Sequence, residues 1–116
     1  MQVPSISTIT LLTAAASGSY VYDLRGVDRA SLQLHSTLTA AATDVITLTI
    51  SNDNVRYVAF STAKTVTFTG GTTDDALFEL GAIDYAYLKV SAAAPSAGVV
   101  TLTGTLNAVA TLTQSV

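Results

Sequence analysis

Few residues in this chain could take part in chemistry. His35 is the only histidine and the chain has no cysteine, so a transition-metal site would need a carboxylate cluster that the sequence does not offer. As a catalytic base, His35 would have to act without a nucleophile motif such as G-x-S-x-G. It falls on the polar side of an alternating segment, between Leu34 and Ser36. We therefore interpret His35 as a surface residue with a structural role.

The acidic residues are seven aspartates and a single glutamate, Glu79. Asp53 and the neighbours Asp74 and Asp75 fall in expected loops, but neither stretch follows the EF-hand pattern of a calcium loop. Aspartate in a loop more often forms the turn itself. A glycosidase needs two acids across a cleft, and residues 70–71, Gly-Gly, lack the lysine and helix start of a phosphate loop. The sequence thus predicts no enzyme, no cofactor and no metal.

The composition limits the possible partners. With 116 residues the chain is long enough for one domain with a core. Only 11% of the residues are charged and the net charge is -3, so no basic cluster is present to bind nucleic acid. A surface rich in threonine and poor in charge suits a protein covered by copies of itself or by a partner. The alternative is an extracellular β domain that simply prefers threonine on its strands.

The N-terminal residues, MQVPSISTITLL, have no basic residue before an apolar run. They do not form a signal peptide, and no apolar run is long enough to span a bilayer. We expect no membrane partner and synthesis in the cytoplasm. Residues 1–16 form either the first strand of the fold or an arm that reaches a neighbouring subunit, and residues 17–116 form a single β-sandwich domain.

The stretch from Asp84 to Leu106 shows the pattern that the whole chain repeats. Alternation of apolar and polar residues indicates strands with one buried face, and we expect residues 84–106 to form a hairpin whose turn contains Pro95. Leu32, Leu34 and Leu38 should face the core in one earlier strand, and Ile46, Leu48 and Ile50 in the next. Residues 39–44 and 70–75 read as loops, and Ser51 to Asn54 as a turn. Counted this way the chain is an all-β, jelly-roll-like β-sandwich of nine or ten short, mostly antiparallel strands.

Two stretches could present a working surface. Residues 55–60, VRYVAF, are apolar on both faces apart from Arg56, which is typical of a central strand or of one whose outer face meets a partner. In the expected hairpin, Tyr85, Tyr87 and Lys89 share an outer face with a ladder of threonines at positions 101, 103 and 105. Three roles stay open for the two tyrosines: a protein interface, a glycan site, or a hydrogen bond at a sandwich corner.

Four segments together carry a resemblance: DLRG (23–26), SLQLHS (31–36), ITLTISNDNVRYVAF (46–60) and DYAYLKVSAAAPSAGVVTLTGTL (84–106). Their order resembles small β-sandwich structural proteins of tailed bacteriophages. The chain departs from that pattern at Asn54, where the pattern prefers glycine, and at Tyr57, where tryptophan is usual. These changes put the exact turn in doubt, but not the sandwich.

The resemblance implies a virion structural protein. The form it favours is a capsid decoration (cement) protein, made in the host cytoplasm, that sits on the capsid surface and binds the major capsid protein and copies of itself as a trimer or dimer. The alternative is a carbohydrate- or receptor-binding module of a head or tail fibre, with Tyr85, Tyr87 and residues 52–54 as its surface. The candidate protein-interface residues are Ile6, Ile9, Leu11, Arg56, Tyr57, Val58, Phe60, Tyr85, Tyr87 and Lys89.

Overall fold

The protein is built from strands alone. The computed structural model describes residues 2–111, with the side chains of residues 3–39, 43–68 and 73–110. Its elements are β1 (Gln2–Ala15), β2 (Gly18–Asp23), β3 (Val27–Ser51), β4 (Val58–Ala82), β5 (Tyr87–Ala92) and β6 (Val100–Thr111). All the pairings are antiparallel. The all-β, jelly-roll-like sandwich expected from the sequence is confirmed.

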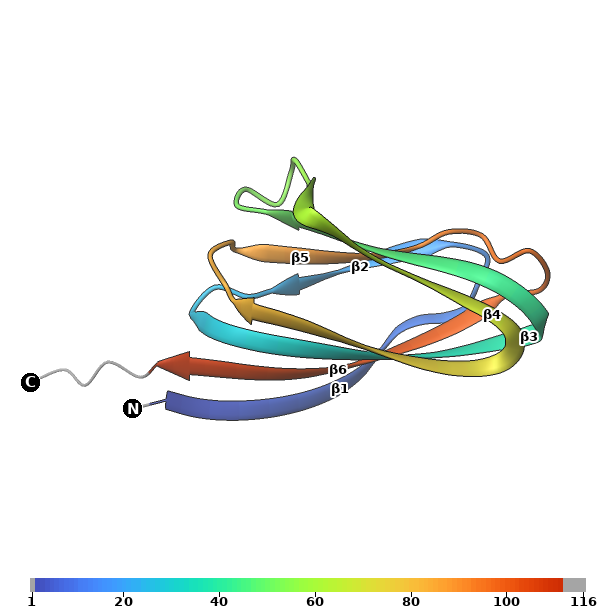
Figure 1. The fold of residues 1–116 in the computed structure, drawn as a ribbon, viewed down its shortest axis with the longest axis horizontal. Coiled ribbons are helices and arrows are strands. Elements are labelled where there is room, and N and C mark those ends of the chain that lie inside the picture. The colour runs from blue at the N-terminus through green and yellow to red at the C-terminus, as the bar shows by residue number, and fades with distance from the viewer. Residues whose placement is uncertain (1, 112–116) are drawn as a thin grey trace, which may run out of the picture.

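The strands form two layers that share β3 and β4. In the first layer β1 pairs with β6, β6 with the N-terminal half of β3, and that half with the C-terminal half of β4. In the second layer β2 pairs with β5, β5 with the C-terminal half of β3, and that half with the N-terminal half of β4. The molecule is elongated, with extents of 56 × 26 × 22 Å (Figure 1).

The expected number of strands is wrong, because β3 and β4 each run 25 residues and pass from one layer into the other. Residues 39–44 and 70–75, expected as loops, lie inside these two strands. The pairing register shifts between Thr37 and Ala42 and again before Asp44. Such bulges let a paired strand bend sharply without ending. Loop-forming residue types therefore mark a corner in a continuous ribbon.

The expected hairpin between residues 84 and 106 is also wrong. Its two strands, β5 and β6, do not pair with each other; each pairs with a different half of β3. The connection between them follows the bend of β3, where Ser96 N donates to Thr43 O (2.9 Å) and Thr39 N donates to Val99 O (3.1 Å). Residues 93–99 therefore cross from layer to layer instead of reversing the chain.

The predicted inward faces do form the core between the layers. Leu32 and Leu34 from β3, Leu88 from β5 and Leu102 from β6 are fully buried, as are Ile46 and Leu48 from the second half of β3. A spacing of two along each strand places these side chains on one face. Polar atoms are also enclosed: the Tyr22 hydroxyl, the Ser36 hydroxyl and both Asp44 carboxylate oxygens have no hydrogen-bond partner among the described residues.

Gly104, on β6, lies directly against Tyr22 of the other layer. A Cβ atom placed on it would overlap the Tyr22 hydroxyl and come 3.1 Å from a methyl group of Leu11. Tyr22 is 6% exposed, and its burial, with Tyr20 nearby, raises its pKa to about 12. The absence of a side chain at Gly104 thus makes room for a tyrosine in the core.

No helical span that could cross a bilayer occurs in the part of the chain that the structure describes.

Candidate functional site

The outer face of the first layer presents a regular array of side chains, which we call the grid. It has three rows, each of one residue from β1, β6, β3 and β4 in cross-strand register. The rows are Ile6–Asn107–Ser31–Glu79, Thr8–Thr105–Gln33–Leu77 and Thr10–Thr103–His35–Asp75. Residues two apart on a strand point to the same side, so each row is followed by another on the same face.

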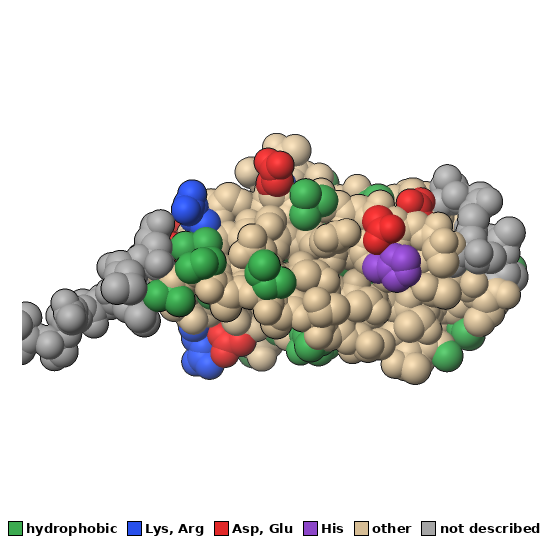
Figure 2. Space-filling model, turned by 90° about the horizontal axis from the view of Figure 1, so that it is seen from below, with side chains coloured by type: hydrophobic (Ala, Val, Ile, Leu, Met, Phe, Trp, Pro, Cys, Tyr) green, Lys and Arg blue, Asp and Glu red, His purple; other side chains and the backbone are tan. Residues whose placement is uncertain are grey.

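The grid is exposed or half-buried throughout, and its charged groups are Glu79 and Asp75. Ile6 is 70% and Leu77 62% exposed, which makes them two of the large apolar side chains that face solvent. The hydroxyls of Thr8 and Thr105 are 2.9 Å apart and share a hydrogen bond across β1 and β6. In Figure 2 the histidine lies beside a carboxylate, and most of the surface around them is neither charged nor hydrophobic. A protein that covers the grid would desolvate two carboxylates, Glu79 and Asp75, of which Asp75 already pairs with His35.

One end of the grid borders a hollow of about 290 Å³. Its lining includes the first row's Ser31, Glu79 and Asn107, together with Arg29 and Val109. A partner could seat a side chain here, which would fix its position on this face.

The predicted outer surface of residues 84–106 is split between the two layers. The threonines at 103 and 105 lie in the grid, whereas Tyr87 and Lys89 point outward from β5, in the other layer. Leu88 and Val90, between and beyond them, are buried. Because β5 and β6 belong to different layers, their outer faces lie on opposite sides of the sandwich.

Tyr57, Tyr87 and Lys89 do come together, as one cluster on the second layer. The Lys89 ammonium lies 4.0 Å from the centroid of the Tyr57 ring, a cation–π distance. Arg25 lies 5.5 Å from the centroid of the Tyr87 ring and makes a salt bridge to Asp23, with Nη2 2.6 Å from Oδ2. Arg25 holds the pKa of Asp23 at about 2. Lys89 and Arg25 thus already interact with aromatic rings, and Arg25 also with a carboxylate, within the cluster itself.

Tyr85 lies apart from Tyr87, in the connection between β4 and β5. Its ring meets Phe60 edge to face, with the ring centroids 5.6 Å apart, and Phe60 in turn lies 5.3 Å from the Lys64 ammonium. Burial, helped by the nearby Asp84 carboxylate, raises the pKa of Tyr85 to about 12. Tyr85 and Phe60 thus form an aromatic pair that packs against the core.

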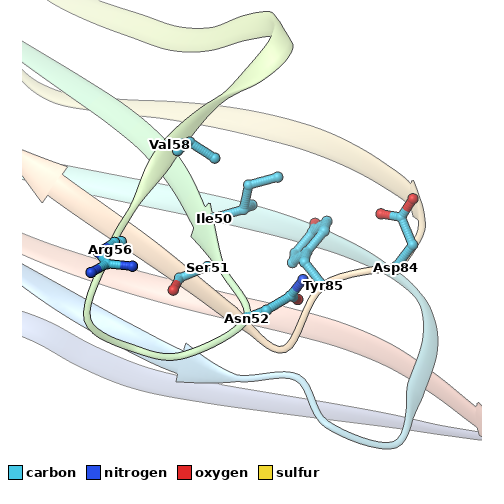
Figure 3. A pocket seen from close by; sticks show the side chains of 7 residues that line it. All are labelled: Ile50, Ser51, Asn52, Arg56, Val58, Asp84 and Tyr85. Atoms are coloured by element: carbon cyan, nitrogen blue, oxygen red, sulfur yellow. The ribbon is translucent and has the colours of Figure 1, made fainter.

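A pocket of about 210 Å³ opens beside this pair, between the β3–β4 turn and the β4–β5 connection. Figure 3 shows its lining: Ile50, Ser51, Asn52, Arg56, Val58, Asp84 and Tyr85. Arg56 and Asp84 lie at opposite ends of the lining. The pocket joins Asn52 and Tyr85, two residues that the sequence placed in the alternative glycan-binding surface.

The turn that supplies half of the pocket is tightly hydrogen-bonded, as its sequence predicted. The Ser51 hydroxyl accepts from the backbone N–H groups of Asp53 (3.2 Å) and Asn54 (3.0 Å) and donates to Asp53 Oδ1 (2.9 Å). The same Asp53 oxygen accepts from Val55 N and Arg56 N, both at 2.9 Å. These bonds hold the pKa of Asp53 below its ordinary value, and the bond from the backbone N–H of Arg56 has the largest effect. Asn54 has a φ of 59°, a left-handed angle that asparagine tolerates.

The remaining candidate interface residues differ in how far they are exposed. Leu11 is 7% exposed and belongs to the core, so its place among the interface residues is wrong. Ile9 is half-buried against the same core. Residues 55–60 are not a central strand: Val55 to Tyr57 precede β4, and Val58, 61% exposed, opens it at the edge of the second layer.

His35 pairs with one carboxylate at the surface. His35 Nδ1 lies 2.8 Å from Asp75 Oδ1, a pair at the surface with side chains 46% and 57% exposed. Among the described residues no three histidine, aspartate or glutamate side chains gather closely enough to hold a metal ion. Asp74 and Asp75 lie in β4, not in a loop.

Sequence reasoning missed two contributors to these surfaces. Leu77 is not among the candidate interface residues, although it alternates with Phe78, which packs against the core, and so faces outward. Asp84 was seen only as the start of a strand. Its role in the pocket depends on β4 and β3 being one hairpin, which no local pattern reveals.

The same fold occurs in proteins of known structure. The SPBc2 prophage-derived protein YomS matches with a TM-score of 0.63 over 90% of this chain and 95% of that chain, at 12% sequence identity. The coat protein of Tobacco streak virus, solved as a dimer, matches with a TM-score of 0.59 over 99% of this chain and 89% of that chain, also at 12% identity. At this identity the likeness extends to the fold alone.

No protein-family model matches the chain. A search of the curated proteins finds no match either.

Proposed function

We propose that this protein is a virion structural protein of a bacteriophage, specifically a capsid decoration protein whose grid binds the outer surface of the shell. The observation that carries the proposal is the grid: twelve side chains in register on four strands, two of them exposed large apolar groups. The fold it shares with a prophage-derived protein and a viral coat protein supports a place in a virus particle.

The size of the grid sets what it can do alone. Strands about 4.8 Å apart and rows about 7 Å apart give roughly 15 Å by 15 Å between the outermost Cα atoms. A specific contact buries about 800 Å² on each partner, so the grid is the centre of such a contact and its surroundings must contribute. Many copies on a regular shell add avidity, which lets each single contact stay small.

The proposed partners are the major capsid protein and further copies of this chain, as a trimer or dimer. The Tobacco streak virus coat protein, solved as a dimer, supports association between copies. Stabilisation comes from buried surface across neighbouring capsid subunits, so the role we propose is non-catalytic and needs no cofactor.

Replacement of the exposed apolar residues of the grid tests this function. Leu77→Asp and Ile6→Asp each place a charge at the centre of the proposed contact, and we expect binding to capsids that lack the protein to weaken about tenfold or more. Val58→Asp is the matched control, because Val58 is equally exposed but lies on the other layer. Co-sedimentation of the purified protein with such capsids measures the affinity.

Resistance of the particles to heat and low salt is the second measurement. Capsids with bound protein should survive conditions that disrupt bare ones, and the Leu77→Asp protein should fail to protect them. The proposal is wrong if bare and covered capsids are equally resistant, or if Val58→Asp weakens binding as much as Leu77→Asp does.

A further inference from the structure

The pocket beside Tyr85 is built differently from the grid. Its wall is a tyrosine ring backed edge-on by Phe60, and Ile50 and Val58 add an apolar side. The Tyr85 hydroxyl is buried, so the part of this residue that the pocket presents is its ring. Around this apolar surface stand an amide, a carboxylate and a guanidinium, from Asn52, Asp84 and Arg56 (Figure 3).

We infer that this pocket binds a single neutral pyranose, as a terminal or internal unit of a glycan. A pyranose presents C–H groups on one face, which pack on an aromatic ring, and hydroxyls around its rim, which need both donors and acceptors. The lining supplies one apolar wall and polar groups of both kinds. Small-molecule sites commonly combine apolar walls with a few placed polar groups.

The polar groups are available to a ligand. Asn52 Oδ1 accepts from Ala86 N (3.1 Å), which fixes the side chain and leaves its NH₂ group to donate. No hydrogen bond or ion pair joins the Asp84 carboxylate or the Arg56 guanidinium to another described residue. One positive and one negative group at opposite ends give no net charge, which favours a neutral ligand over an acidic sugar.

The site is preformed. Asn52 and Arg56 stand on the turn that Ser51 and Asp53 hold with hydrogen bonds of 2.9–3.2 Å. Because the turn is already ordered, little conformational entropy is lost on binding. A volume of about 210 Å³ is below the usual range for drug-sized ligands and suits one sugar ring. We expect a dissociation constant of about 1 mM for a free monosaccharide.

The test is a titration of the isotope-labelled whole chain with glucose, galactose, mannose and N-acetylglucosamine, followed by amide NMR shifts. At least one sugar should shift the amides of Asn52, Arg56, Tyr85 and Ala86. Asp84→Asn and Asn52→Asp should each weaken this binding about tenfold. Asn52→Asp keeps the oxygen that accepts from Ala86 N, so the connection stays in place while the amide donor is lost.

Asp74→Asn is the control, because it makes the same charge change at an exposed position in the other layer. It should leave sugar binding unchanged. Glycine is titrated in parallel, since a zwitterion could also span Arg56 and Asp84. The inference is overturned if none of the four sugars shifts the pocket amides at tens of millimolar, if Asp74→Asn weakens binding as much as Asp84→Asn, or if only glycine binds.

Discussion

Gly104 is the position at which one added methyl group has the clearest consequence. Gly104→Ala puts a Cβ atom into the Tyr22 hydroxyl and against Leu11, and we expect a loss of about 1–3 kcal/mol in the free energy of unfolding, as in other overpacked cores. Tyr22→Phe removes a buried hydroxyl that has no partner among the described residues, so it should cost little or stabilise.

A double variant tests whether Gly104→Ala destabilises the protein because its Cβ overlaps the Tyr22 hydroxyl or for a reason unrelated to Tyr22. Gly104→Ala combined with Tyr22→Phe should recover part of the loss, because the two changes act at one contact and do not add. Urea denaturation of the four proteins measures this coupling. Simple additivity would show that Tyr22 is not what excludes a side chain at Gly104.

Asp44 is a buried carboxyl group at 1% exposure, and burial raises its pKa. The folded protein thus retains the Asp44 proton to a higher pH than the unfolded chain, where the pKa is about 3.9. The contribution of Asp44 to stability is full below that value and is lost as pH rises through the folded-state pKa. Asp44→Asn removes the ionisation and should make the protein more stable at neutral pH, by about 1 kcal/mol or more.

Thermal denaturation near pH 4 and near pH 7 checks the sign for Asp44. We expect Asp44→Asn to lose less stability between pH 4 and pH 7 than the unaltered protein does. Asp74→Asn, an exposed carboxylate of the same strand pair, should change neither value. A larger loss of stability near pH 7 in Asp44→Asn would contradict the assignment.

At the scale of elements, β1 is the segment whose role the sequence left between strand and arm. In this structure it pairs with β6 of its own chain from Gln2 to Ala15, and it contributes Leu11 to the core. We therefore expect deletion of residues 1–16 to unfold the domain or lower its stability severely, instead of releasing a folded monomer.

Two point variants grade the contribution of β1. Leu11→Ala should cost about 2–5 kcal/mol, as a buried leucine does, whereas Ile6→Ala, at a 70% exposed site, should change stability by less than about 0.5 kcal/mol. Urea denaturation measures both. A shortened chain with an unchanged unfolding midpoint would instead support an arm.

Sequence patterns placed the inward faces correctly and the strand ends badly, for one physical reason. Alternation indicates which side of a strand is buried, and the residues it placed inside are indeed buried: Leu32, Ile46, Leu88 and Leu102. It does not report which strand lies alongside. Glycine, threonine and aspartate around residues 70–75 favour a loop locally. Pairing with β3 on both sides of the corner, and at Ala42 and Gly71 within it, overrides that preference and keeps the segment in β4.

At the scale of the whole molecule, the grid and the pocket beside Tyr85 are separate. The grid lies on the outer face of the layer that contains β1 and β6. The pocket is lined by residues of the β3–β4 turn and the β4–β5 connection, and Figure 1 shows both segments at one end of the sandwich. The two surfaces share no residue, so a protein attached through the grid would not cover the lining of the pocket by that contact. The sequence found members of both surfaces, Ile6 for one and Tyr85 for the other, but it could not separate them, since it treated β5 and β6 as neighbours.

The passage of β3 and β4 through both layers also decides how the protein responds to force. Gln2 and Thr111 are register partners at one end of the β1–β6 pair, so tension between them would peel that pair open one hydrogen bond at a time. Prying the layers apart meets a different resistance, because two continuous 25-residue strands tie one layer to the other. The sandwich is thus weak to a pull on its two ends and resistant to separation of its two layers.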